Sequence, residues 1–332
     1  MTNRSKLNCA EIGILVYPDA QLAAVHGLSD LFDVANRMAA RHGATGAPLV
    51  RVSHWQREKK GKAPVRVFDT HPDLDSTPQI VIAPPSLATL ASAEEMAPDA
   101  RWLKERHAGG AALASVCAGA FLIAETGLLA GRAATTHWVY ADTLQERFPD
   151  IDVVADKLIV DDGDIITAGG LMAWTDLGLK LVDRLLGPTI MADTARFLLV
   201  DPPGREQRYY SNFAPKLHHG DEAILKVQHW LQSKGARGVT LQEMATRASL
   251  EPRTFLRRFH KATGFKPTEY CQNVRVGKAR EMLEFTTKSV DQIAWSVGYE
   301  DAGAFRKVFQ KVLGLSPGEY RNRFAIKRSA TR

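Results

Sequence analysis

The sequence has little cysteine and no long apolar run. Its 332 residues include three cysteines, at positions 9, 117 and 271, and so small and scattered a set argues against a disulfide framework. The longest apolar runs, such as IGILVY at 12–17, are far too short to span a bilayer. The opening residues MTNRSKLNCAEIG carry charge but no apolar segment of a secretory signal. These absences predict a cytoplasmic protein that does not enter a membrane.

Metal and phosphate motifs are missing as well. The sequence has no His-Glu-x-x-His, no paired-cysteine spacing and no G-x-x-x-x-G-K-[ST]. The adjacent His218 and His219 lie in a stretch rich in proline and glycine, where we expect them to be solvated. We therefore expect neither a metal nor a cofactor.

Positive charge is concentrated near the end of the chain. From residue 216 onward there are 22 Lys and Arg against 11 Asp and Glu, whereas the preceding residues hold 21 and 26. This asymmetry predicts a nucleic-acid-binding module attached to an acidic regulatory or catalytic module. Charge alone leaves a merely solvated basic face as the alternative.

Up to about residue 200, short apolar runs alternate with helical periodicity. Helical spacing relates Leu28, Leu31, Phe32, Ala35 and Met38. The expected strands are 11–17, 49–53, 65–68, 80–83, 111–116, 157–160 and 164–168. Alternation of this kind predicts an α/β domain, a flavodoxin-like, mostly parallel sheet with helices on both faces. We expect this domain at 1–200, a linker at 201–220, an all-α domain at 221–325 and a basic tail at 326–332.

The basic part contains an internal repeat, the strongest pattern in the sequence. TFLRRFHKATGFKPTEY at 254–270 matches AFRKVFQKVLGLSPGEY at 304–320 at an offset of fifty residues. Each copy predicts two short helices joined by a tight turn, with a glycine ending the second helix. The matched pairs are Phe255 and Phe305, Phe259 and Phe309, Gly264 and Gly314, Pro267 and Pro317, and Tyr270 and Tyr320.

Two short helices with a basic, exposed second helix make a helix-turn-helix. In the first copy we expect Leu241, Met244 and Ala245, and then Phe255, Leu256 and Phe259, on the core side. The residues expected to face DNA are Arg253, Thr254, Arg257 and Arg258 in the first copy and Ala302, Gly303, Arg306 and Lys307 in the second. Arginine can bridge O6 and N7 of guanine, and lysine contacts phosphates. The duplication argues against the alternative of a generic helical bundle with a basic surface.

Residues 221–324 resemble the DNA-binding domain of AraC/XylS-type bacterial transcription regulators, above all in GYEDAGAFRKVFQKVLGLSPGEYR at 298–321. The resemblance implies seven helices and two helix-turn-helix units joined by a long helix at about 268–284. It also implies that both recognition helices enter successive major grooves of promoter DNA. One departure is Glu251, at a position where the family has serine as the N-cap.

In the first domain, AALASVCAGAFLIAETG at 111–127 has the form of a nucleophile elbow, a sharp strand-to-helix turn that presents Cys117. The stretches SVCAGAFLIAETGLLAGRAATTHW at 115–138 and DGDIITAGGLMAWTDLGLKLV at 162–182 resemble the PfpI/ThiJ-like domain, a relative of class I glutamine amidotransferases. Both resemblances together describe the GlxA-type members of the AraC family.

The catalytic arrangement of that resembled domain is incomplete here. Its enzymes place a histidine directly after the cysteine, where this chain has Ala118, and an acid where it has Ala24. A glycine-rich loop that supplies N–H groups is replaced by Pro84 and Pro85, which have none to donate. We therefore expect no catalytic residue. A hydrolase or glyoxalase-like enzyme and a regulator oxidised at the cysteine stay as alternatives, because a helix N-terminus favours the Cys117 thiolate.

Ligands of open parallel sheets bind at the C-terminal ends of the strands. The effector-pocket candidates expected at this edge are Cys117, His137, Pro85, Ser86, Gly169, Gly170, Trp138 and Asp176, with Trp174 nearby. Cys117 is there either an inert buried residue or a ligand contact. A helix N-terminus suits an anion and tryptophan a cationic headgroup. The GlxA-type resemblance implies amino acids or quaternary-ammonium metabolites, so we expect a zwitterion.

The sequence thus predicts a DNA-binding transcription regulator and not an enzyme. Its expected partners are double-stranded promoter DNA, a small-molecule effector, a second copy bound through the N-terminal domain, and RNA polymerase.

Overall fold

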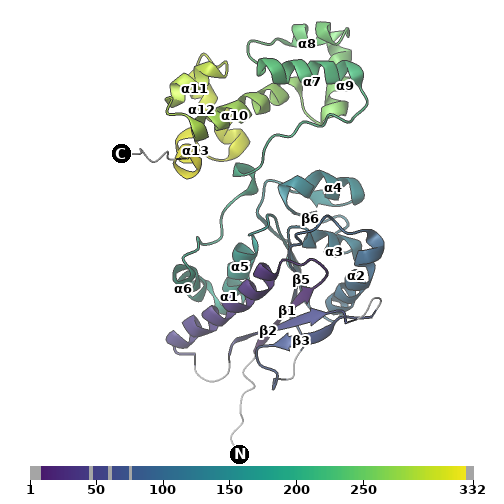
Figure 1. Ribbon diagram of the computed structural model, residues 1–332, viewed down its shortest axis with the longest axis vertical. Coiled ribbons are helices and arrows are strands. Elements are labelled where there is room, and N and C mark those ends of the chain that lie inside the picture. The colour runs from purple at the N-terminus through teal and green to yellow at the C-terminus, as the bar shows by residue number, and fades with distance from the viewer. Residues whose placement is uncertain (1–8, 45–47, 59–61, 75–76, 327–332) are drawn as a thin grey trace, which may run out of the picture. The chain divides into compact units, whose positions relative to one another are not determined.

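The computed structural model describes residues 9–44, 48–58, 62–74 and 77–326. The chain forms two compact units, which divide after Gln207 (Figure 1). The sequence predicted a domain end at residue 200 and a linker at 201–220. The predicted basic tail at 326–332 lies outside the described residues except for its first position.

A seven-stranded sheet forms the centre of the N-terminal unit, with strand order β3-β2-β1-β4-β5-β9-β8. Its strands are β1 (Ala10–Val16), β2 (Val50–Gln56), β3 (Val65–Asp69), β4 (Ile80–Ala83), β5 (Ala112–Val116), β8 (Ile159–Asp161) and β9 (Ile165–Ala168). The inner pairs are parallel, and the edge strands β3 and β8 pair antiparallel. All seven expected strands are confirmed. The parallel two-residue strands β6 (Ala133–Ala134) and β7 (Asp152–Val153) were not predicted, because two residues show no alternation.

Helices cover both faces of this sheet (Figure 1). They are α1 (Leu22–Arg41), α2 (Ala93–Ala108), α3 (Gly119–Glu125), α4 (Ala141–Arg147), α5 (Trp174–Leu186) and α6 (Pro188–Leu198), with the 3-10 turn η1 (Trp138–Tyr140) before α4. Helices α1, α5 and α6 pack together on one face, and α2 and α3 on the other. The five α1 residues with helical spacing are all buried, which confirms the predicted apolar stripe. Each face thus has its own apolar core.

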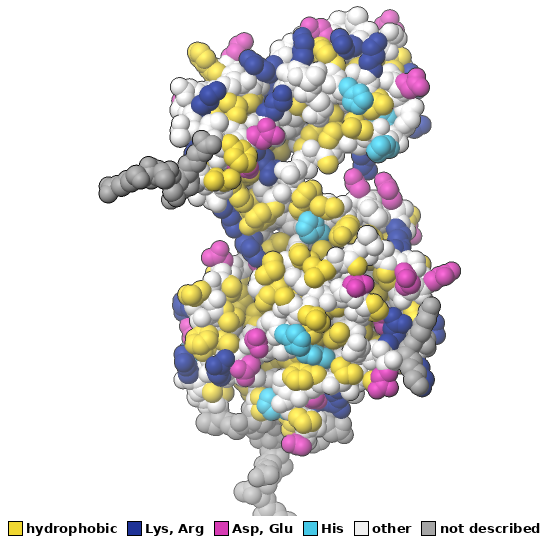
Figure 2. Space-filling view, viewed as in Figure 1, with side chains coloured by type: hydrophobic (Ala, Val, Ile, Leu, Met, Phe, Trp, Pro, Cys, Tyr) yellow, Lys and Arg dark blue, Asp and Glu magenta, His cyan; other side chains and the backbone are white. Residues whose placement is uncertain are grey.

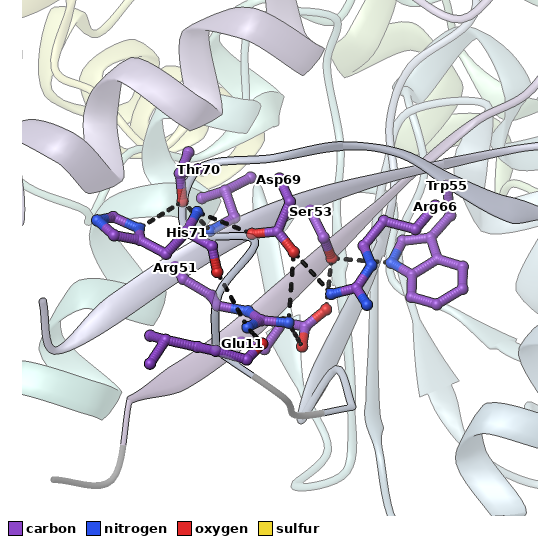
Figure 3. Close-up of polar contacts among 10 residues, drawn as sticks. Glu11, Arg51, Ser53, Trp55, Arg66, Asp69, Thr70 and His71 are labelled. Atoms are coloured by element: carbon purple, nitrogen blue, oxygen red, sulfur yellow. Dashed lines mark hydrogen bonds and ion pairs between the residues drawn. The ribbon is translucent and has the colours of Figure 1, made fainter.

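A buried ion-pair network ties β1, β2 and β3 together (Figure 3). The Arg51 guanidinium is fully buried and lies 2.7 Å from the Glu11 carboxylate and 3.4 Å from Asp69. Ser53 donates a hydrogen bond to Glu11 at 2.6 Å, and Arg66 pairs with Asp69 from β3. Removing one partner from a buried pair leaves an uncompensated charge. The network therefore anchors the antiparallel edge strand.

The C-terminal unit is all helical in its described part. Its helices are α7 (Glu222–Lys234), α8 (Leu241–Arg247), α9 (Pro252–Thr263), α10 (Pro267–Phe285), α11 (Val290–Ser296), α12 (Ala302–Leu313) and α13 (Pro317–Phe324). This agrees with the seven helices that the resemblance implied, and α10 spans the long helix expected at 268–284. The unit has two apolar cores, one around α7–α9 and the other around α11–α13, and α10 contributes to both.

Candidate DNA-binding surface and effector pocket

Helices α8–α9 and α11–α12 form the two helix-turn-helix units. The repeated residues are the inside of each: Phe255, Phe259, Phe305 and Phe309 are all fully buried. Gly264 and Gly314 follow α9 and α12 with φ of +76° and +79°, the left-handed C-cap that the sequence predicted. The duplication in sequence is therefore a duplication of cores.

The outer faces of α9 and α12 carry the basic residues. Arg253 and Arg257 on α9 and Arg306 and Lys307 on α12 are exposed. Thr254, Ala302 and Gly303 are half-buried near the starts of the same helices. In Figure 2, Lys and Arg side chains are prominent on the visible face of the C-terminal unit. Such side chains supply phosphate contacts, and arginine also reads guanine.

Arg258 is one of the predicted DNA contacts, and it is ion-paired with another helix of the protein although its side chain is 39% exposed. Its Nε and Nη2 donate to Asp221 at 2.9 and 2.7 Å. Asp221 is also the N-cap of α7 and accepts from the backbone N–H of Ile224. The bond from Arg258 holds the pKa of the Asp221 carboxyl below its usual range. Arg258 thus fastens the recognition helix α9 to α7 instead of pointing freely at DNA.

Two core assignments on this domain were wrong. Leu241 and Leu256 are 38% and 40% exposed, whereas Met244 and Ala245 are buried as expected. Leu241 is the first residue of α8, and Leu256 directly follows the inward-facing Phe255. Both lie at the edge of the apolar stripe, which is narrower than the run of apolar letters suggests.

The starts of the two recognition helices are not equivalent. Glu251, the N-cap of α9, makes no side-chain bond to the helix backbone. Asp301, the N-cap of α12, accepts from the N–H groups of Gly303 and Ala304 at 2.9 and 2.8 Å. These bonds lower the pKa of Asp301. The departure noted at Glu251 therefore leaves α9 without the cap that α12 has.

In the N-terminal unit, Cys117 occupies the predicted elbow between β5 and α3. Its φ is +54°, a strained value for a residue with a Cβ, and its N–H donates to Ala168 at 2.8 Å. The side chain is buried, and burial raises the pKa of the thiol to about 11. Burial thus opposes the thiolate that the helix N-terminus was expected to favour, and it outweighs the backbone hydrogen bond of Ala118, which lowers the pKa of the thiol.

The positions that correspond to the catalytic groups of the resembled enzymes hold side chains and carbonyls that are engaged elsewhere or buried. Ala24, at the position where the resembled enzymes have an acid, is fully buried. The carbonyls of Pro84 and Pro85 accept from the Tyr17 hydroxyl at 2.5 Å and the Gln21 N–H at 2.7 Å. His137 accepts from the Val139 N–H, and burial lowers its pKa. Within the described ranges no hydrogen bond joins His137 to Cys117.

A cavity of about 530 Å³ opens at the carboxyl edge of the sheet, beside the ends of β1 and β2. Its walls include Tyr17 after β1, Arg57 after β2, Asp99 on α2, and Ala118 and Leu122 of the elbow helix. Arg57 and Asp99 form a two-bond ion pair at 2.7 and 2.8 Å. Burial raises the pKa of the Asp99 carboxyl in spite of this partner.

Of the predicted pocket residues, Ser86 alone lines this cavity. Tyr17, Arg57 and Asp99 were missed, although the first two follow strands and so carry the signal used for the other residues. Cys117 lies next to Ala118 of the wall but does not line the cavity itself. Trp174 packs against α1 instead, since a Cβ on Gly27 would lie 2.5 Å from its ring.

Three further candidates, Asp176, Trp138 and Gly169, lie against a segment of the chain itself. Asp176 is 1% exposed and accepts two bonds from Arg205. The backbone N–H of Trp138 donates to Oε1 of Gln207 at 3.1 Å. A Cβ on Gly169 would lie 1.9 Å from Nε2 of Gln207. This part of the carboxyl edge, where the sequence predicted an open crevice, is therefore filled by residues 205–207.

Two family models match the chain. Residues 244–323 match a helix-turn-helix domain, and residues 90–184 match the DJ-1/PfpI family. The chain is 30% identical over 228 residues to the HTH-type transcriptional regulator ArgR of Pseudomonas aeruginosa, covering 66% of this chain and 67% of that protein. The chain belongs to the AraC/XylS family of DNA-binding transcription regulators.

Two further relatives are similar to this regulator over comparable lengths of sequence. The HTH-type transcriptional regulator CdhR of P. aeruginosa is 27% identical over 231 residues, which are 69% of this chain and 68% of that protein. GlxA of Rhizobium meliloti is 29% identical over 219 residues, which are 64% and 66%. The regulator thus unites an AraC-type DNA-binding domain with a DJ-1/PfpI-type domain, as the two resemblances implied.

The described residues offer neither a metal-binding cluster nor a membrane-spanning helix. No group of three or more His, Cys, Asp or Glu side chains there is placed to hold a metal ion. No helix among them is both long enough and apolar enough to cross a membrane.

Proposed function

We propose that this regulator binds promoter DNA in a sequence-specific manner and that a small metabolite in the N-terminal cavity controls that binding. The observation that carries the proposal is the duplicated helix-turn-helix, with exposed Arg253 and Arg257 on one recognition helix and Arg306 and Lys307 on the other. Two such units fit successive major grooves, which lie about 34 Å apart. The regulator would act in the cytoplasm, with RNA polymerase as a further partner at the promoter.

The cavity beside Tyr17 supports the effector half of the proposal. Its volume of about 530 Å³ is that of a small-molecule site, and it lies at the edge of the sheet where ligands of such folds bind. The Arg57–Asp99 pair offers a charge of each sign, which suits a zwitterion such as an amino acid or a quaternary-ammonium metabolite. A homodimer formed through the N-terminal unit belongs to the same proposal.

The alternatives depend on a reactive Cys117. A nucleophilic or peroxide-sensing cysteine needs an accessible thiolate. Here the side chain is buried and its pKa is raised to about 11. These properties favour a binding role for the N-terminal unit over hydrolase, glyoxalase-like or redox chemistry. Turnover that disappears in Cys117→Ala, or DNA affinity that changes with peroxide, would revive them.

Footprinting with the full chain tests the DNA half. Duplexes are selected from a random pool, and protection of two segments one helical turn apart is expected. Absence of any sequence-specific protection would refute it. A thermal-shift screen with amino acids, betaines and small carboxylates tests the effector half, because a ligand of the native state raises the unfolding temperature. The control is Ala118→Phe, a change in the cavity wall that should abolish the shift.

A further inference from the structure

The segment Arg205–Glu206–Gln207, here called the strap, is bound along the carboxyl edge of the N-terminal sheet. Gln207 is 2% exposed. Its Nε2 donates to the backbone carbonyls of Thr136 and Lys157 at 2.8 and 3.0 Å and to Oγ1 of Thr135 at 3.1 Å. Its Oε1 accepts from the backbone N–H of Trp138, and its own backbone N–H donates to the Asp156 carbonyl at 2.9 Å. The side-chain amide thus uses both its donor and its acceptor groups.

The other two strap residues are held as well. Arg205 binds Asp176 through two nitrogens, and Asp176 is almost fully buried. Glu206 forms a bridge to Lys157 through the backbone and an ion pair through its side chain at 3.0 Å. The strap therefore has the composition of a linker but is docked on the N-terminal unit.

The chain enters the DNA-binding unit directly after the strap. Tyr209 is 9% exposed, and Arg280 of α10 donates to the carbonyls of Tyr209 and Ser211. Arg280 also donates to Tyr320 at 2.9 Å. Since α10 contributes to the cores of both helix-turn-helix units, the residues just after the strap are fastened to the helix that joins them. Arg208 alone separates Gln207 from Tyr209.

A short hydrogen-bonded route leads from the cavity to the strap. Ala118 lines the cavity, and the carbonyl of its neighbour Cys117 accepts from Thr136 Oγ1 at 2.8 Å. The carbonyl of the same Thr136 accepts from Gln207. A ligand that displaces the elbow by a fraction of an ångström therefore acts on a residue that also holds the strap.

We propose that the strap is the coupling element of this regulator: its docking links the state of the cavity to the DNA-binding unit through Gln207. The proposal rests on the proposed function, because it takes DNA as the ligand at the other end. Coupling between two sites is reciprocal, so DNA binding must also change the stability of the strap and the elbow. A docked segment that opens locally is a two-state element of the kind that such coupling requires.

Hydrogen exchange of the full chain, with and without a duplex selected from a random pool, tests this coupling. DNA should change exchange at 205–207, 135–138 and 117–122 by at least about fivefold. In Gln207→Ala, exchange at 205–207 should be fast and the response at 117–122 lost, while the duplex still binds. Gln207→Asn, whose shorter amide cannot reach all three acceptors, should give an intermediate response.

Gln145→Ala is the matched control, because Gln145 also donates to two backbone carbonyls, those of Pro149 and Ile151, away from the strap. It should respond to DNA as the wild type does. Bound DNA that leaves 117–138 unchanged would overturn the coupling while the proposed function stands. Unchanged exchange at 205–207 in Gln207→Ala would overturn it too. A wild-type chain that selects no duplex would instead refute the proposed function.

Discussion

The two helix-turn-helix units have separate cores built from matching residues, and they differ at the surface. Phe255 and Phe259 of the first have counterparts in Phe305 and Phe309 of the second, and all four are fully buried. At the surface, α12 is capped by Asp301, and its Arg306 pairs with Asp291 of α11. Helix α9 has no side-chain cap and is fastened to α7 through Arg258. The repeat therefore retains the buried residues that packing requires, whereas the exposed residues of the two units differ.

The largest effect should come from the two matching cores. Phe259→Ala and Phe309→Ala each remove a fully buried ring, which costs about 3–5 kcal/mol of unfolding free energy. Hydrogen exchange in the full chain should localise the first loss to α8–α9 and the second to α11–α12, since the two cores are separate. Leu256→Ala, at a 40% exposed position, is the control. An equal loss there would contradict this account of the core.

The surface difference predicts unequal roles for two arginines in DNA binding. Arg257 is exposed and has no ion-pair partner in the described part of the chain, whereas Arg306 is paired with Asp291. Arg257→Ala should weaken binding to a selected duplex by about 1–3 kcal/mol if the guanidinium bridges a guanine, and should relax specificity at one base pair. Competition binding with single-base variants of the duplex measures both effects. A uniform loss over all variants would reassign Arg257 to a phosphate contact.

The N-caps of α9 and α12 differ, and a change of pH tests the cap of α12. Two backbone bonds lower the pKa of Asp301 in the folded chain, so its capping is complete above the pKa of an unfolded aspartate, about 3.9. It is lost as pH falls through the lower folded value. Amide NMR signals of Gly303 and Ala304 should shift in that acidic range. In Asp301→Ala the start of α12 should exchange roughly fivefold faster.

Glu251→Ala is the matched control for the cap, because Glu251 makes no bond to its helix. It should leave exchange at the start of α9 unchanged. Faster exchange in that variant would show that α9 is capped after all, and the two units would then differ less than their geometry indicates.

Local patterns in the sequence were enough for the sheet, the repeat and the cores. The seven strands follow from apolar runs, and the buried phenylalanines follow from the offset of fifty residues. Local patterns do not predict contacts between polar residues that are far apart in the sequence. Arg258 meets Asp221 across 37 positions, and Gln207 meets Thr136 across 71. The strap lies in a proline-rich stretch with the composition of a linker, and only these distant contacts show that it is docked.

The site shows the same limit. The rule that ligands bind at the carboxyl ends of parallel strands gave the correct edge for the cavity. It did not say which part of a seven-stranded edge stays open. That depends on the strap, which fills the part near Gly169 and leaves the part near Tyr17. Occupancy by the chain's own residues is a tertiary property, and no local periodicity records it.

The smallest effect should come from the exposed ion pair between Asp291 of α11 and Arg306 of α12. Asp291 and Arg306 are 65% and 50% exposed, and pairs of this kind contribute about 0.2–1 kcal/mol. Asp291→Ala removes the partner and a nearby negative charge, so Arg306 becomes free for DNA. Affinity should therefore rise slightly, by less than about 1 kcal/mol, and should fall more steeply with salt. A salt titration of Asp291→Ala against wild type measures this, and a loss of affinity would mean that the pair orients Arg306 toward DNA.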